Sequence, residues 1–180
     1  MIGKTIAIYG GSFDPPHIGH ELIVHEVLSV LNDIDQFIVV PTYLNPFKSD
    51  SFLDSTVRYS LVQQLFKDVA KVAVSDFEIK QERKVFTLDT VNFLKQQYDA
   101  KKIYLIIGSD NAQTFHLWHE YEQLKSIVEL VVITRKNYAV DGISINVDVD
   151  VSSTQLRQEL NLDLIPKKIQ NEVKKIWNKE

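Results

Sequence analysis

Short apolar runs alternate along the chain with segments whose apolar residues recur at helical spacing. The apolar runs occupy residues 5–9, 37–41, 72–74, 103–107 and 130–133. Helical spacing marks three segments between them: Leu22, Ile23, Val27 and Leu31 within 18–31; Val57, Leu61 and Leu65; and Leu88, Val91, Phe93 and Leu94. Continuous apolar strands between amphipathic helices predict a parallel sheet that is buried on both faces. The pattern therefore predicts an α/β protein.

The C-terminal part of the chain departs from this alternation. Residues 152–160 and 166–177 read as two helices, with Ser152 or Ser153 as a cap and Pro166 in a first helical turn. No internal repeat, low-complexity tract or long linker interrupts the sequence. We therefore expect a single domain over residues 1–180. It should be a Rossmann-like parallel sheet with helices on both faces and a short C-terminal helical segment.

Composition excludes several classes of protein. Hydrophobic residues make up 44% of the 180 residues and charged residues 24%, as in ordinary globular proteins. The absence of cysteine excludes disulfides, thiolate metal sites and cysteine nucleophiles. A net charge of −4 argues against a dedicated nucleic-acid binder. No apolar stretch approaches membrane-spanning length and the N-terminus has no apolar leader, so we expect a cytoplasmic protein without a membrane partner.

The stretch at residues 10–20, Gly-Gly-Ser-Phe-Asp-Pro-Pro-His-Ile-Gly-His, is the most informative in the chain. It joins an apolar strand to an amphipathic helix, where backbone N–H groups converge as in a phosphate-binding junction. His17 and His20 are three residues apart and should share a helix face, and Gly19 between them would let a substrate approach closely. The alternatives are a capped helix with two exposed histidines, or a zinc site. A zinc site lacks a third ligand nearby.

A second candidate phosphate site lies at residues 151–157, Val-Ser-Ser-Thr-Gln-Leu-Arg. The hydroxyls of Ser152, Ser153 and Thr154 gather at a predicted helix start, where N–H groups lack helical partners. Arg157 in the first turn opposes the helix dipole, and a bound anion would reverse that cost. The alternative is a serine cap followed by a solvated arginine.

The two motifs, in this order, resemble those of the nucleotidyltransferase superfamily with an HxGH motif. The sequence of the first motif is most similar to that of the bacterial nicotinate-nucleotide adenylyltransferases. That resemblance implies transfer of an adenylyl group from ATP to nicotinate mononucleotide, giving deamido-NAD and pyrophosphate, with Mg²⁺ that arrives on ATP and has no protein ligand assigned to it. It implies these residues for catalysis: His17, His20 and Arg157. For ATP binding it implies Gly10, Gly11, Ser12, Phe13, Gly19, Gly108, Asp110, Ser153 and Thr154.

The resemblance also implies residues for the acceptor. Trp118 would stack on the nicotinate ring, and Thr87, at a helix start, would present a backbone N–H to the nicotinate carboxylate. Lys48 would hold the acceptor phosphate from the irregular stretch at residues 43–55. Asp110 would contact ribose hydroxyls. From the residues alone, a core tryptophan and an N-cap aspartate remain open alternatives.

At the positions expected to bind the acceptor, the sequence departs from the family pattern. The family usually has histidine where Phe47 stands, and Ser-Tyr where Val85 and Phe86 stand before Thr87. Nicotinamide mononucleotide and phosphopantetheine are alternative acceptors within the enzyme class. A catalytically idle nucleotide-binding module is the alternative outside it. The expected partners are thus ATP and nicotinate mononucleotide, with no nucleic acid, in a monomer or a homodimer.

Overall fold

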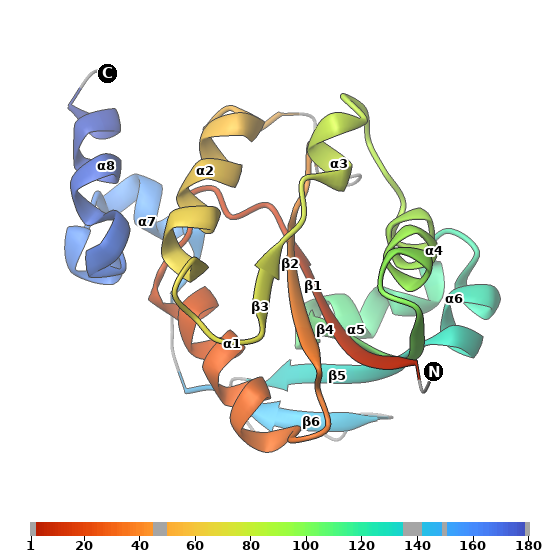
Figure 1. Cartoon of the computed structure of the whole chain (residues 1–180). Helices are drawn as coiled ribbons and strands as arrows, with labels where there is room; N and C mark the ends of the chain where they lie inside the picture. The colour runs from red at the N-terminus through yellow and green to blue at the C-terminus, as the bar shows by residue number, and fades with distance from the viewer. Residues whose placement is uncertain (1–2, 45–49, 135–141, 149–150, 179–180) are drawn as a thin grey trace.

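The computed structural model describes residues 3–44, 50–134, 142–148 and 151–178, and it places helices against both faces of a parallel sheet (Figure 1). The strands are β1 (Lys4–Gly11), β2 (Gln36–Pro41), β3 (Val72–Val74), β4 (Ala100–Gly108), β5 (Glu129–Thr134) and β6 (Ile143–Asn146). The α-helices are α1 (Ile18–Val30), α2 (Ser55–Phe66), α3 (Phe77–Lys80), α4 (Thr87–Gln97), α5 (Ser109–Thr114), α6 (Tyr121–Ile127), α7 (Ser153–Glu159) and α8 (Lys167–Trp177). Two short 3₁₀ turns are η1 (Phe115–Leu117) and η2 (Leu162–Leu164).

The strand order is β3-β2-β1-β4-β5-β6, and every pairing is parallel. The chain builds outward from β1 to β3 and then crosses back to continue from β4 on the other side of β1. This reversal leaves a crevice beyond the carboxyl ends of β1 and β4, which is where open α/β sheets bind their ligands. The Rossmann-like parallel sheet predicted from the apolar runs is confirmed.

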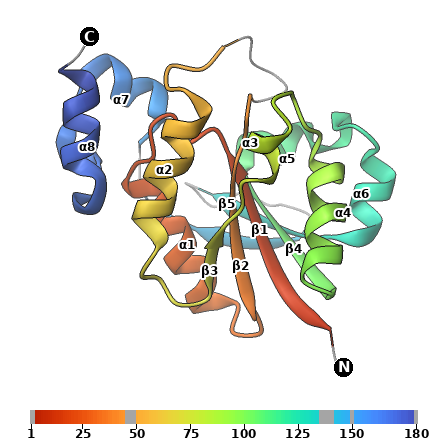
Figure 2. The same cartoon turned by 45° about the horizontal axis from the view of Figure 1, so that its top comes forward.

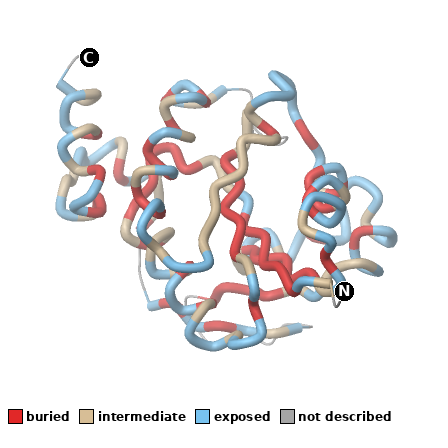
Figure 3. Tube along the Cα trace, in the orientation of Figure 1, coloured by how far each residue is buried: buried red, intermediate tan, exposed pale blue. Residues whose placement is uncertain are grey.

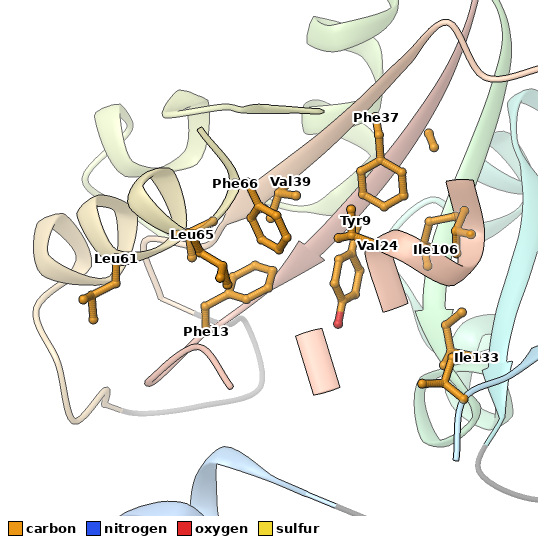
Figure 4. Close-up of a cluster of buried hydrophobic side chains, with 14 of the residues drawn as sticks. Tyr9, Phe13, Val24, Phe37, Val39, Leu61, Leu65, Phe66, Ile106 and Ile133 are labelled. Carbon is orange, nitrogen blue, oxygen red and sulfur yellow. The ribbon is translucent and has the colours of Figure 1, made fainter. Parts of the chain in front are cut away.

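Two hydrophobic clusters cover the two faces of the sheet. In β1, Ala7 and Tyr9 point to one cluster and Ile6 and Ile8 to the other, so successive side chains alternate between the faces. Figure 4 shows the first cluster, which α1 and α2 close. Helices α4 and α6 close the second. Burial on both faces explains why the central strands form continuous apolar runs (Figure 3).

Helix faces were predicted less accurately than strands. Leu22, expected on the buried face of α1, is 38% exposed, and Val24 is buried in its place. Phe93 on α4 is 40% exposed and stacks on Phe77 of α3, with ring centroids 4.1 Å apart. Strand β6 was not predicted at all, because only alternate residues of this edge strand are apolar.

The C-terminal helices lie beside α2 (Figure 2). The Gln64 side chain of α2 donates to the Lys168 carbonyl of α8 at 2.8 Å, while Ile169 and Val173 of α8 are buried. Pro166 is the N-cap of α8, one position before the first turn in which it was expected. No helix in the described part of the chain is both long and apolar enough to cross a membrane.

Candidate active site

A cavity of about 710 Å³ lies in the crevice beyond β1 and β4. Strand ends and helix starts line it, as the topology requires. It brings together most of the residues predicted from the sequence: Gly10, Gly11, Ser12, His17, Gly19, His20, Thr87, Gly108, Asp110, Trp118, Ser153 and Thr154. Motifs that lie far apart in the sequence therefore share one site.

Three predicted residues are placed differently. The side chain of Phe13 is 1% exposed and does not line the cavity, because it packs with Leu65 in the hydrophobic cluster (Figure 4). Its ring centroid lies 4.7 Å from that of His20, so Phe13 supports a cavity residue from behind. Arg157 is directed at the chain beside the cavity and does not line it. Lys48 lies outside the described residues.

The two histidines of the first motif form a stacked pair at the start of α1. His17 is the N-cap and His20 follows three residues later, with ring centroids 3.7 Å apart. The backbone N–H of His17 donates to Nδ1 of His20 at 3.1 Å. Because Nδ1 accepts, the proton of the neutral ring is on Nε2. Burial, and secondarily the neighbouring His17, hold the pKa of His20 well below its usual value. His20 is thus a neutral N–H donor at the cavity.

Gly19 lies in a tightly packed position beside this pair. A Cβ atom there would lie 3.0 Å from Cγ1 of Val151 and 3.1 Å from the His17 ring. These contacts are closer than ordinary van der Waals distances. The absence of a side chain at Gly19 therefore lets α1 approach the segment before α7, in addition to any room it leaves for a substrate.

Side chains at the start of α7 fasten the second motif to the first. The Ser153 hydroxyl donates to the Pro15 carbonyl at 3.0 Å, and Nη1 of Arg157 donates to the Asp14 carbonyl. Nη2 of Arg157 also donates to the Thr154 hydroxyl at 3.3 Å. Ser152 caps α7 by accepting from the Gln155 N–H at 3.2 Å, as the sequence predicted. The two phosphate motifs thus form one wall.

Asp14, a residue of the first motif to which the sequence assigned no role, anchors the loop before α2. Its carboxylate is 3% exposed and accepts the backbone N–H groups of Phe52 and Leu53, each at 2.8 Å. Nη1 of Arg157 lies 3.9 Å from the same carboxylate. One residue therefore connects the histidine motif, the arginine of the second motif and the loop that contains Lys48.

Sequence reasoning missed Arg58, which is 1% exposed on α2. Its guanidinium donates to the carbonyls of Ser12, Thr42, Tyr43 and Leu53 at 2.6, 2.7, 2.6 and 3.1 Å. It thereby joins the first motif to both ends of the loop between β2 and α2. The available signal was its position: Arg58 falls on the same stripe of α2 as the buried Leu61 and Leu65.

The opposite wall of the cavity is aromatic. Trp118 lines it and packs edge-to-face on Phe115, with ring centroids 5.3 Å apart. The Trp118 Nε1 is buried and has no hydrogen-bond partner among the described residues. Phe86 stacks on His119 at 4.3 Å, and both rings line the cavity beside Thr87. Trp118 therefore belongs partly to the core and partly to the site.

Asp110 lines the cavity, but it does not cap a helix. The N-cap of α5 is Gly108, and Asp110 lies in the first helical turn. The N-cap alternative for this residue was therefore wrong. A Cβ atom built on Gly108 would meet no protein atom within 4 Å, so this glycine borders open space at the carboxyl end of β4.

Glu78 is a buried carboxyl group in the same aromatic wall. It is 6% exposed, lines the cavity from α3, and accepts a hydrogen bond from the Thr90 hydroxyl of α4 at 2.6 Å. Burial raises the pKa of Glu78 to about 7, although the Thr90 hydrogen bond acts in the opposite direction. Nothing in the sequence indicated the burial of this residue.

Glu78→Gln is expected to stabilise the protein at alkaline pH. Unfolded chains ionise this carboxyl near 4.5, whereas the folded protein holds the proton to about 7, so folding loses free energy as pH rises between these values. A neutral glutamine that keeps the Thr90 hydrogen bond should raise the free energy of unfolding at pH 8 by up to about 3 kcal/mol. Urea unfolding at pH 8 and pH 4 measures this. An equal gain at both values would contradict it.

Comparison with known proteins agrees with this geometry. The cytidylyltransferase-like family model matches residues 8–159. A relative from Aliarcobacter butzleri is 47% identical over 172 residues, covering 93% of this chain and 94% of the relative. One from Campylobacter jejuni is 40% identical, with 97% of each chain covered. Both are named as probable nicotinate-nucleotide adenylyltransferases.

Solved structures show the same architecture. The nicotinic acid mononucleotide adenylyltransferase of Plasmodium falciparum, solved with NaAD, superposes with a TM-score of 0.73 at 25% identity, covering 96% of this chain and 89% of that one. A structure from Vibrio parahaemolyticus gives 0.69 at 23% identity, covering 94% of this chain and 97% of that one, which shows the shared fold.

The fold and the match to the family model define a nucleotidyltransferase of the cytidylyltransferase-like class. Within that class, relatives that share one name are 40–47% identical to this chain over most of its length, which shows the family to which it belongs. The chain belongs to the nicotinate-nucleotide adenylyltransferase family.

Proposed function

We propose that the protein transfers the adenylyl group of ATP to nicotinate mononucleotide, releasing pyrophosphate and forming the dinucleotide of nicotinate and adenine, a step of NAD biosynthesis. The observation that carries the proposal is the single cavity in which both phosphate motifs face an aromatic wall. A triphosphate and a flat ring would thus be held on opposite sides of one space. The family relationship supports the same reaction.

The residues of the phosphate wall would bind and orient the triphosphate. Ser153 and Thr154 line the cavity and carry hydroxyls. Arg157 would contribute positive charge from beside the cavity, where its guanidinium donates to the Asp14 carbonyl. His17 and His20 would stabilise charge that develops on the α-phosphate and on the leaving pyrophosphate. The acceptor phosphate oxygen attacks the α-phosphorus, and the bond to pyrophosphate breaks. Such transfer needs positioning and electrostatic stabilisation more than a protein nucleophile.

The aromatic wall would hold the acceptor. Trp118 offers a ring face large enough to stack on a pyridine ring, and a positively charged pyridinium adds a cation–π attraction. Thr87 is the first residue of α4, where the backbone N–H groups lack helical partners and attract an anion. Lys48 would bind the acceptor phosphate.

Magnesium fits this site as a companion of ATP. The described residues contain no group of three or more His, Asp or Glu side chains that could hold a metal ion. Mg²⁺ keeps several water ligands and commonly binds substrate phosphates, where it neutralises phosphate charge. Its ligands would therefore be mainly the phosphate oxygens of ATP and water.

Pyrophosphate release from ATP, measured with each acceptor in turn, tests the proposal. We expect release with nicotinate mononucleotide to exceed release with nicotinamide mononucleotide or phosphopantetheine. Preference for either alternative would replace the proposed acceptor. Binding of ATP without release on addition of any acceptor would instead identify a nucleotide-binding module and contradict the enzymatic assignment.

A further inference from the structure

The buried pair of Glu78 and Thr90 has no role in the transfer step described above. The two side chains come from different helices, α3 and α4, and meet at 2.6 Å in the wall of the cavity. Thr87 lies one helical turn before Thr90 on the same helix. Both members of the pair are nearly inaccessible, at 6% and 3% exposure. A carboxyl group is therefore held beside the helix start that would receive the acceptor's ring substituent.

The carboxyl group has one oxygen to spare. Oε1 of Glu78 accepts from Thr90, and Oε2 accepts no hydrogen bond within the part of the chain that the structure describes. When the group is neutral, Oε2 carries the proton and offers an O–H donor. When it is ionised, the same oxygen is an acceptor that bears negative charge. The two states thus favour opposite partners in the cavity.

We propose that Glu78 is a specificity-determining residue, whose protonated form favours an acceptor with a ring carboxylate and whose ionised form favours one with a ring carboxamide. The inference rests on the proposed function. A neutral Glu78 donates a hydrogen bond toward a carboxylate, whereas an ionised one repels it. A carboxamide offers N–H donors that an ionised Glu78 accepts. The preference for acid over amide therefore depends on pH.

The pKa of Glu78 is set by burial and by the Thr90 hydrogen bond, and not by neighbouring charges. On α3 and its N-cap, Lys80 and Asp76 pair with each other at 2.8 Å. On α2, Arg58 is directed at main-chain carbonyls, and burial raises the pKa of the Tyr59 hydroxyl.

The other elements packed against α3 add no buried charge. On α4, Asp89 and Lys95 are exposed, and β2 carries no charged residue. The pKa of Glu78, about 7, follows from desolvation opposed by the single hydroxyl hydrogen bond. Its charge therefore changes across the neutral range.

Comparison of two acceptors isolates this effect. Nicotinate and nicotinamide mononucleotide share ribose and phosphate and differ only in the ring substituent. Titration of the acceptor phosphate, of His17 and His20 and of ATP therefore affects both rates alike. The ratio of their kcat/KM values responds only to groups that sense the substituent, so a purely structural role for Glu78 leaves it unchanged.

The experiment measures pyrophosphate release with both acceptors from pH 6 to pH 9. For the wild-type protein we expect the acid-to-amide ratio of kcat/KM to fall at least about tenfold across this range, since two charges in one cavity interact by a tenfold factor or more. Glu78→Gln is neutral and keeps an acceptor for Thr90, so its ratio should stay flat at the wild-type low-pH value. Glu122→Gln, on an exposed residue of α6, is the matched control and should follow the wild type.

Thr90→Val provides a second, directional test. The Thr90 hydrogen bond lowers the pKa of Glu78, so its loss should move the fall in the ratio to higher pH. A wild-type ratio that is flat, or a Glu78→Gln ratio that still falls with pH, would overturn the inference while leaving the proposed function intact. Absence of pyrophosphate release with either acceptor would overturn both.

Discussion

Arg58→Met is expected to destabilise the protein by about 3–5 kcal/mol, the cost of removing one partner from a buried, charged hydrogen-bond network. The guanidinium is 1% exposed and donates to four carbonyl groups. Methionine fills a similar volume but donates nothing, so these carbonyls would lose a partner inside the protein. Burial lowers the pKa of Arg58 and the negative charge of Asp14 opposes this shift, so the buried Asp14 carboxylate would also lose a nearby positive charge.

The same substitution should weaken binding of the mononucleotide. Arg58 bonds to Thr42 and Tyr43 on one side of the loop and to Leu53 on the other. These contacts fix both ends of the segment that includes Lys48. We expect KM for the mononucleotide to rise more than KM for ATP, whose phosphate wall is also held by α7. Steady-state kinetics at low temperature, where the variant is still folded, measures both.

Urea unfolding measures the loss of stability. Two further variants serve as controls for it. Arg58→Lys keeps the charge with fewer donors and should lose less than Arg58→Met. Arg83→Met removes an exposed arginine whose hydrogen bond within the described residues is to its neighbour, the Lys84 carbonyl at 3.2 Å, and it should be nearly neutral. Equal stability of Arg58→Met and the wild type would show that solvent or neighbouring donors replace the guanidinium.

The sheet could be predicted because its strands are buried on both faces. A strand such as β4 places Leu105 and Ile107 on one face and Tyr104 and Ile106 on the other, so the whole run is apolar and visible in the sequence. Strand β6 has a partner on one side only and is apolar at alternate residues, a weaker signal over four positions. Periodicity therefore identified the centre of the sheet and missed its edge.

Part of the local structure of the two motifs could be predicted for a different reason. A serine cap obeys local rules, and Ser152 follows them at the start of α7. Gly10 and Gly11, in contrast, do not form a turn, because they are the last residues of β1 and pair with β2. Long-range contacts obey no local rule. That Arg157 would bond to Asp14, or that Glu78 would meet Thr90 in a buried pair, depends on how α7 and α4 dock on the sheet. Sequence spacing does not contain that information.

His20→Asn is expected to lower kcat by about 10²–10³-fold, the usual cost of removing one preorganised donor from a developing negative charge. The side chain of His20 has two separable functions. Its Nδ1 accepts the His17 N–H at the start of α1, and its Nε2 carries the proton that we propose is donated to the α-phosphate in the cavity. Asparagine places an oxygen where Nδ1 stands, so it can keep the first interaction while removing the second.

Because the pKa of His20 is low, His20→Asn removes a neutral N–H donor and does not remove a positive charge. Burial and the neighbouring His17 keep the ring neutral, so the wild-type donor is an N–H group at neutral pH. His20→Gln, whose amide reaches farther, should restore part of the activity by replacing the Nε2 donor. The rate of pyrophosphate release under single-turnover conditions reports the chemical step directly.

His25→Ala is the matched control for this prediction. His25 lies on the same helix, is exposed, and does not line the cavity, so its loss should leave kcat unchanged. Thermal unfolding of His20→Asn should stay close to that of the wild type, because the N-cap interaction of α1 is retained. If His20→Asn is folded and turns over at the wild-type rate, the donor at the α-phosphate must be His17 or a backbone amide, and His20 then serves only to order the start of α1.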